Sequence, residues 1–223
     1  MAKRTDTSAL PRSPLNRDRV LEAALSLADD RGIEFLTMRK LGQALGVEAM
    51  SLYNHVANKD DILDGIVDRV AQEFELPSAA EDWEASIRKS AISAHDALQR
   101  HTWACGLMMS GARVIPARIR YMDSLLGCLR DAGFSAELTY TAYHALDAHI
   151  FGFSLWQAGH SFTAADVPDL AARFLREFPL DSYPHLAEHV EQHLSDGRHR
   201  EVSAFEFALD LLLDGLRRTR EAS

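Results

Sequence analysis

A short stretch of the sequence, GVEAMSLYNHVANKDDIL, gathers polar side chains that could bind a nucleic acid. Tyr53, His55 and Lys59 carry donors of the kind that hold phosphate oxygens. Asn54 can form two hydrogen bonds with an adenine edge, and the Ser51 hydroxyl can bond to several bases. These residue types at this spacing therefore favour recognition of DNA.

The apolar residues of the same stretch indicate how it is presented. On a helix that begins near Glu48, Leu52 and Val56 lie one turn apart and can be buried together. The opposite face is then small and polar. We expect that outward face to consist of Glu48, Ala49, Met50, Ser51, Asn54 and His55.

Two preceding helices would support that face. Asn16 is a good N-cap for a first amphipathic helix that ends at Gly32, and Thr37 caps a second, short helix that ends at Gly46. Helices this short are stable only when they pack on a third. Their order predicts a helix-turn-helix. The second helix would add three phosphate donors, namely Thr37, Arg39 and Lys40.

The distribution of charge agrees with this location. The chain has a formal net charge of −9, which argues against non-specific coating of nucleic acid, because such coating needs a broad basic surface. Residues 1–59 nevertheless contain nine Lys and Arg against seven Asp and Glu, whereas the remainder has 15 against 26. Only the N-terminal quarter therefore suits a polyanion.

The rest of the sequence is helical in pattern, without the period-two alternation of strands, and its 47% hydrophobic content can fill a large core. We predict an all-α fold of about nine or ten helices. Later helices are expected near 82–101, 103–110, 116–131, 136–158, 164–177, 184–195 and 202–219. The predicted organisation is a flexible basic arm (1–14), a three-helix helix-turn-helix domain (15–60), a bridging helix (61–76) and a larger helical domain (77–223).

Several classes of protein are disfavoured by what the sequence lacks. It has no signal-peptide pattern and no run of about 18 apolar residues that could span a membrane. Cys105 and Cys128 have neither CxxC nor zinc-site spacing. We expect a cytoplasmic protein with no membrane partner, no cofactor and no structural metal.

The stretch GIEFLTMRKLGQALGVEAMSLYNHVANKDDILDGI resembles the DNA-binding domain of the tetracycline-repressor (TetR) family, notably in its first glycine, its LT-RKL helix and its LY-HV-NK end. The later run RDAGFSAELTYTAYHALDAHIFGFSL is similar to the C-terminal domain of the tetracycline-repressor subgroup. The resemblance implies phosphate contacts by Thr37, Arg39, Tyr53, His55 and Lys59, and base contacts by Ala49, Met50, Ser51 and Asn54. The subgroup has Gln, Pro, Thr and Trp at the last four positions, so we expect a different operator.

The resemblance also implies a ligand-responsive repressor that binds a palindromic operator in double-stranded DNA as a homodimer. The last helix is apolar over much of its circumference, so we expect dimerisation through the helices near 136–158 and 202–219. A small hydrophobic effector would release the DNA. Candidate pocket residues are the polar or aromatic side chains on apolar helices, namely Trp103, Met108, Met109, His144, Asp147, Phe151, Phe153 and Trp156.

Metal-dependent alternatives are weaker. His185, His189 and His193 form one stripe of a helix and could belong to a zinc-sensing repressor, although no carboxylate or cysteine is poised as a further ligand. The subgroup holds a magnesium–drug chelate with a histidine and a glutamate. Met108 and Trp156 or Gln157 fall at those places here, so we do not expect this chain to bind that chelate.

Two further classes stay open. A helical enzyme could use His144, Asp147 and His149 as acid–base groups, although no nucleophile, phosphate loop or metal motif accompanies them. Alternatively, the helix-turn-helix could have lost DNA binding and serve as an interaction module, because Ala49 and Met50 offer no hydrogen bond to a base.

Overall fold

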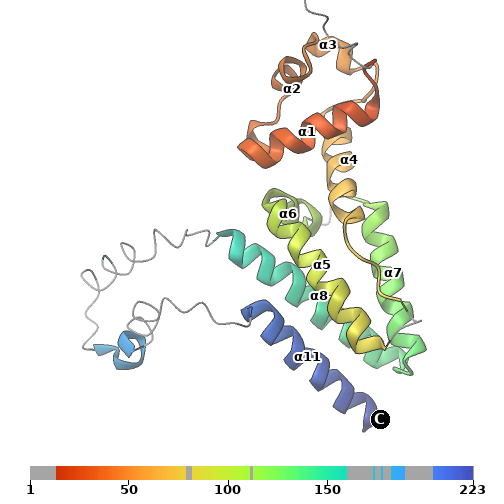
Figure 1. The fold of residues 1–223 in the computed structure, drawn as a ribbon, viewed down its shortest axis with the longest axis vertical. Coiled ribbons are helices and arrows are strands. Elements are labelled where there is room, and N and C mark those ends of the chain that lie inside the picture. Colours follow the sequence, from red (N-terminus) through yellow and green to blue (C-terminus); the bar gives the residue numbers. More distant parts are fainter. Residues whose placement is uncertain are drawn as a thin grey trace, which may run out of the picture.

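Figure 1 shows the computed structural model of the chain, which describes residues 14–78, 82–110, 113–159, 173, 177, 182–188 and 203–222. Regular structure within these ranges is helical, without a strand, which confirms the predicted all-α class. Parts of three predicted segments lie outside the described residues: nearly all of the arm, most of the helix near 164–177, and the second half of the helix near 184–195 with His189 and His193.

The N-terminal part of the chain folds into short helices whose ends are set by capping residues. Asn16 caps α1 (Arg17–Arg31) by accepting a hydrogen bond from the amide of Arg19, and Thr37 caps α2 (Met38–Leu45) in the same way. A 3₁₀ turn, η1 (Ile33–Phe35), joins them. Gly46 ends α2 in the left-handed conformation (φ 68°) that glycine adopts without strain.

These helices share a small core with the start of α4 (Lys59–Gln72). Leu41 of α2, Leu52 of α3 (Ala49–Leu52) and Ile66 of α4 are fully buried against α1. The second half of α4 belongs to a different core, because Val67 and Val70 pack with the later helices. We call α1 to α3 with the first half of α4 the head, and the later helices with the second half of α4 the body.

The end of α4 differs from the sequence-based expectation. The predicted bridging helix extends to residue 76, but α4 ends at Gln72. Side chains of the body replace the missing helical hydrogen bonds: Ser90 Oγ donates to the carbonyl of Glu75 (2.6 Å), and Ser93 Oγ accepts from the amide of Glu75 (3.0 Å). An early stop is therefore stabilised by tertiary contacts that local sequence does not reveal.

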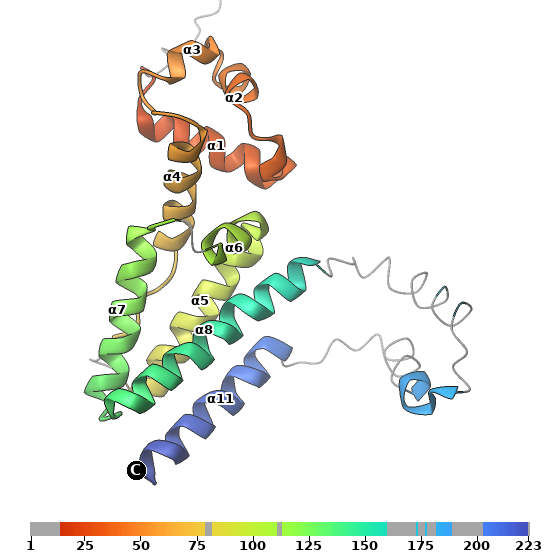
Figure 2. The same cartoon turned by 180° about the vertical axis from the view of Figure 1, so that it is seen from behind.

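The body consists of the later helices, which Figures 1 and 2 show from opposite sides. They are α5 (Trp83–Arg100), α6 (Thr102–Met109), α7 (Pro116–Asp131), α8 (Ala136–Gly159) and α11 (Ala204–Glu221). The bounds agree with the predicted helices to within a few residues. Helices α8 and α11 lie side by side and run in opposite directions in both views. Among the described residues, no helix has the length and apolar character needed to cross a membrane.

Candidate nucleic-acid interface and effector site

Helix α3 is held at the tip of the head, far from the body (Figure 1). Leu52 anchors it in the head core, and the turn before it packs tightly on α2. A Cβ atom on Gly42 would lie 2.9 Å from the carbonyl oxygen of Val47 and 3.2 Å from the amide of Ala49. Glycine is therefore required at position 42, because any side chain would push α3 away from α2.

The regular helix at this site is shorter than the spacing predicted. It covers only Ala49–Leu52, and Tyr53 to His55 continue it as a turn in which the amide of His55 still bonds to the carbonyl of Leu52 (2.9 Å). Val56 is buried as expected. The expected outward face is thus formed partly by a helix and partly by a turn.

The predicted base-reading residues lie together on this face. Met50 is 75% exposed and Asn54 is also exposed, whereas Ala49 and Ser51 are half-buried. Asn54 offers an amide and Ser51 a hydroxyl for hydrogen bonds, whereas Ala49 and Met50 are apolar.

The predicted phosphate donors surround that face. Tyr53, Lys59, Thr37 and Arg39 are exposed, and His55 is half-buried. Thr37 Oγ1 already accepts the capping hydrogen bond, which leaves its hydroxyl proton for a phosphate. The Lys40 ammonium lies 2.9 Å from the centre of the Phe35 ring, so a cation–π contact holds it at the edge of the site.

Arg17 and Asp61 fix the start of α4, where Lys59 sits. Two hydrogen bonds of 2.8 and 2.7 Å join the guanidinium to the carboxylate. The pKa of Asp61 is lowered, mainly by the bond from Arg17 and also by the amide of Ala57. The carboxylate is therefore committed within the head, which limits its repulsion of an approaching phosphate.

The predicted effector residues do not all meet. The structure brings Asp147 and Phe151 of α8 together with Arg118 of α7, which the sequence analysis did not single out. Arg118 Nη2 lies 2.7 and 2.9 Å from the two oxygens of Asp147, and its guanidinium carbon lies 3.9 Å from the centre of the buried Phe151 ring. The sequence did contain an indication that Arg118 faces the interior, because it lies one turn before Tyr121, which is buried, on α7.

The surroundings of this ion pair are apolar. Burial raises the pKa of Tyr121 to about 12, and that of the Cys105 thiol to about 11. The Cys105 thiol donates to the carbonyl of Phe151 (3.4 Å), and Met108 is buried in the same core. Charged groups framed by aromatic and sulfur-containing side chains could orient a mostly apolar ligand.

The other predicted pocket residues lie elsewhere. Met109 and Trp156 are 52% and 57% exposed, and His144 is exposed with its ring edge-on to Tyr140. Phe153 is half-buried at the contact between α8 and α11.

Two histidines, His95 of α5 and His149 of α8, contact the start of α11 and hold it against these two helices. The sequence did not predict that they act together. The ring of Phe205 stacks on His95, with centroids 3.9 Å apart, and on His149, with centroids 4.6 Å apart. His149 Nε2 donates to the carbonyl of Phe205 (3.0 Å), and His95 Nδ1 is 2.9 Å from Ser154 Oγ. Burial lowers the pKa of both histidines, which favours the neutral form of each ring.

Trp103 belongs to the junction between head and body. Its indole nitrogen donates to Asp29 of α1 (2.7 Å), which also lies 2.7 Å from Nδ1 of buried His101. His101 Nε2 lies 3.0 Å from Glu73 at the end of α4, and Arg100 binds the same carboxylate (2.6 Å). Both imidazole nitrogens therefore face carboxylates, and they can donate together only when the ring carries two protons.

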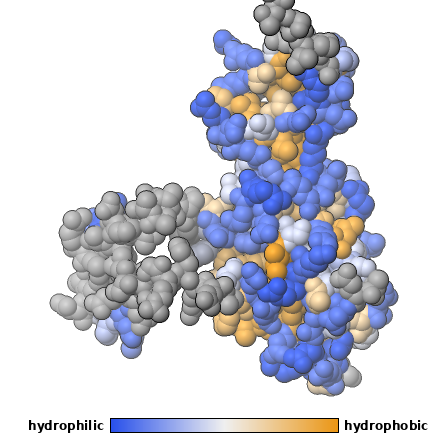
Figure 3. Space-filling view, in the orientation of Figure 1, coloured by the Kyte–Doolittle hydropathy of each residue, from blue (hydrophilic) through white to orange (hydrophobic). Residues whose placement is uncertain are grey.

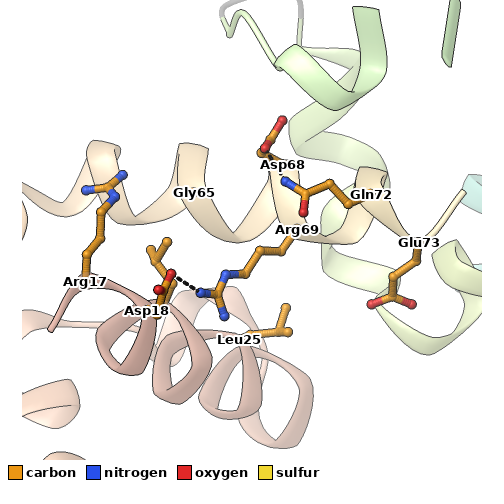
Figure 4. Close-up of a pocket in the computed structure, with 9 residues that line it drawn as sticks. Arg17, Asp18, Leu25, Gly65, Asp68, Arg69, Gln72 and Glu73 are labelled. Atoms are coloured by element: carbon orange, nitrogen blue, oxygen red, sulfur yellow. Dashed lines mark hydrogen bonds and ion pairs between the residues drawn. The ribbon is translucent and has the colours of Figure 1, made fainter. Parts of the chain in front are cut away.

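A cleft of about 630 Å³ opens beside this junction, between α1 and α4 (Figure 4). An ion pair from Arg69 to Asp18 (2.9 Å) crosses it. The cleft is lined by Arg17, Asp18, Leu21, Leu25, Gly65, Asp68, Arg69, Gln72 and Glu73. Its mixed charges and position distinguish it from the apolar surroundings of Arg118.

The arrangement does not support the enzyme or zinc alternatives. His144 contacts tyrosines, Asp147 binds Arg118, and His149 bonds to the backbone of α11, so the three groups do not converge. The described residues contain no cluster of three or more histidines, cysteines or carboxylates that could hold a metal ion. His189 and His193 lie outside the described residues.

A helix-turn-helix head carried by an all-α body defines the class of protein as a DNA-binding regulator with a helical effector domain. Comparison with known proteins gives the same class. Residues 20–66 match the model of bacterial regulatory proteins of the tetR family, and residues 76–220 match the tetracyclin repressor-like C-terminal domain.

Known proteins are similar to this chain over most of its length, both in sequence and in structure. It is 33% identical to the class D tetracycline repressor protein of Escherichia coli over 157 residues, or 69% of this chain and 72% of that protein. The structure of apo ActR from Streptomyces coelicolor superposes with a TM-score of 0.73 at 26% identity, covering 95% of this chain and 99% of ActR. That of BioQ with its double-stranded DNA operator gives 0.61 at 25% identity, covering 92% and 99%.

The chain belongs to the tetR family of bacterial regulatory proteins. Repressors of this family are ligand-responsive and bind DNA. This confirms the resemblance drawn from the helix-turn-helix motif.

Proposed function

We propose that the chain is a homodimeric repressor that binds a palindromic DNA operator and is released by a small, mostly apolar effector. One observation carries the proposal: α3, at the tip of the molecule, and the turn after it present Met50, Ser51 and Asn54, with phosphate donors around them. The related BioQ was solved with its operator, and ActR also in complex with actinorhodin.

The proposed division of labour follows the two cores. Residues 15–60 would bind DNA, residues 61–76 would act as the bridge, and residues 77–223 would bind effector and partner. Support comes from α4, whose first half packs in the head core and whose second half packs in the body core. A shift of the body helices would thus be transmitted to the head through a rigid element.

The proposed dimer interface is the outer face of α8 and α11. These two helices keep large apolar side chains exposed, namely Tyr140, Leu155, Trp156, Phe207 and Leu211, with exposed fractions of 46–67%. Hydrophobic patches are visible on the body in Figure 3. Apolar surface of this kind on two adjacent helices favours a four-helix contact with a second copy. Two-fold symmetry would then place two recognition helices on half-sites about 34–36 Å apart.

The proposed effector site lies around Arg118, Asp147 and Phe151, between α7 and α8. An aromatic ligand with one polar edge would stack near Phe151 and compete for the ion pair. Binding at the two sites is thermodynamically linked, so the effector should lower the affinity for the operator by the same factor by which the operator lowers the affinity for the effector. Trp103, which joins head and body, would report the change without binding the effector.

The decisive experiment is selection of bound duplexes from a random library, followed by a salt titration on the enriched sequence. We expect an inverted repeat and a steep loss of affinity with salt, because several phosphates are neutralised by each subunit. Failure to enrich any duplex at low salt would contradict the proposal and favour the interaction-module alternative.

Point variants separate phosphate contacts from base contacts. Lys59→Ala should weaken binding to every duplex and reduce the salt slope by about one for each subunit. Asn54→Ala should instead change which sequence is preferred, at a cost of about 1–3 kcal/mol for the correct base. Equal losses on all sequences from Asn54→Ala would remove that residue from the base-reading set.

A further inference from the structure

The large apolar side chains of the head are buried or half-buried, with two exceptions. Among the described residues from 14 to 66, only Met50 and Tyr53 are exposed large hydrophobics, at 75% and 45%. Both lie at the recognition segment, on α3 and at its end. Met50 and Tyr53 are thus neighbours in the sequence, and with Ala49 they give the recognition segment an apolar surface among its polar side chains, as a contact surface requires.

The geometry of α3 fixes the direction of Met50. Each residue turns the helix by about 100°, so Met50 lies about 200° from Leu52. Leu52 points into the head core with no exposed surface. Met50 therefore points directly away from the core, while Ala49, about 60° from Leu52, is half-buried. The close packing at Gly42 fixes this direction, since α3 cannot rotate against α2.

We infer that Met50 reads the 5-methyl group of a thymine in the major groove, once in each half-site. The inference rests on the proposed function, since it names the operator feature that the proposed interface recognises. The thymine methyl is the apolar group that the major groove presents among its donors and acceptors. A thioether is a weak acceptor, so Met50 cannot discriminate through hydrogen bonds, but its flexible side chain can follow a methyl group closely.

The neighbouring side chains make this contact specific. Ala49 adds a second small apolar surface, whereas Ser51 and Asn54 supply the hydrogen bonds for adjacent bases. The half-site would thus combine one thymine read by shape with bases read by polar contacts. Tyr53, the other exposed apolar residue, carries a hydroxyl that suits the phosphate beside that thymine.

The test replaces one methyl group at a time. The enriched operator is resynthesised with deoxyuridine in place of each thymine in turn, and dissociation constants are measured at fixed salt. One position in each half-site should lose about fourfold in affinity, which is what burial of one methyl group is worth, and about 15-fold when both half-sites are changed. Other thymines should tolerate the change.

Variants assign the effect to Met50. Met50→Ala should bind the thymine and deoxyuridine duplexes equally, and Met50→Leu should keep most of the preference. Met109→Ala is the matched control, because Met109 is also exposed but lies on α6 of the body. Melting temperatures of all variants should match that of the wild type, since neither methionine fills the core.

The outcomes are distinct. An enriched duplex that shows no sensitivity to deoxyuridine, or a sensitivity that Met50→Ala retains, would overturn the inference and leave the proposed function intact. Absence of any enriched duplex would overturn both.

Discussion

The head and the body of this molecule place their functional side chains in opposite ways. In the head, the side chains proposed to bind DNA point outward from α2, α3 and the turn that follows α3, and a compact core lies behind them. In the body, the groups proposed to respond to effector, Arg118 and Asp147, lie inside, with only 20% and 23% of their side chains exposed. The head therefore presents a preformed surface, whereas an effector would reach the proposed site in the body only if the helices around it rearranged.

The two cores also differ in size. Among the described residues, the head core contains 11 buried residues and the body core 28. A small core loses a larger fraction of its stability when one side chain is removed. The comparison predicts that equal damage in the two cores will have unequal consequences.

The largest expected effect is that of Leu52→Ala, which should lower the free energy of unfolding of the head by about 2–5 kcal/mol. Amide hydrogen exchange should show protection lost in α1 to α3 while the body stays protected, and DNA binding should disappear. Leu209→Ala, an equally buried site in α11, is the matched control and should leave the head protected. Uniform loss of protection across both parts in Leu52→Ala would mean that the cores are not separable.

Arg118→Ala should destabilise the body by about 2 kcal/mol, because Asp147 would lose its partner in a mostly apolar place. The double variant Arg118→Met with Asp147→Leu should recover much of that loss, since it removes the desolvated charge as well. Denaturant titrations of the single and double variants measure both values. A double variant less stable than Arg118→Ala would contradict this reasoning. It would show that the ion pair stabilises the fold beyond avoiding an unpaired charge.

Asp29→Asn tests whether the junction couples the two parts. The substitution removes the charge facing His101 but keeps an acceptor for the indole of Trp103. We expect a loss of about 1 kcal/mol, the net value of a typical hydrogen bond, and a less cooperative thermal transition. Asp30→Asn, at the exposed neighbouring position, should change neither quantity. A single sharp transition at the wild-type temperature in Asp29→Asn would contradict the coupling.

The smallest effect concerns pH. Burial lowers the pKa of His95 and His149 below the ordinary value of 6.5, so the unfolded chain binds more protons than the native one just below that pH. Stability should therefore fall as the pH drops from about 6.5, and α11 should loosen first, because both rings stack on Phe205. Melting temperatures of His149→Gln should vary less with pH over this range than those of the wild type. His144→Gln, at an exposed site, should behave as the wild type does.

Much of the head could be predicted because its signals are local. Asn16, Thr37 and Gly46 set helix ends through contacts within a few residues, and the caps lie where the sequence places them. The outward face follows from the burial of Leu52 and Val56 one turn apart. The length of α3 could not be read in this way, because a short turn keeps the same burial pattern as a longer helix.

The candidate effector site could be predicted only in part, for a physical reason. Helical spacing predicts that Phe151 lies on the buried face of α8, and Asp147 lies one turn before it. Spacing cannot say which side chain of another helix meets them, so Arg118 was not predicted, and Trp103, a predicted effector residue, lies at the junction between head and body. The sequence by itself determined the helices, their caps and the class of regulator, since these depend on neighbours along the chain. Only the tertiary structure decided the partners of Arg118, His101 and Phe205, because those contacts join residues that lie 28 to 110 positions apart in the sequence.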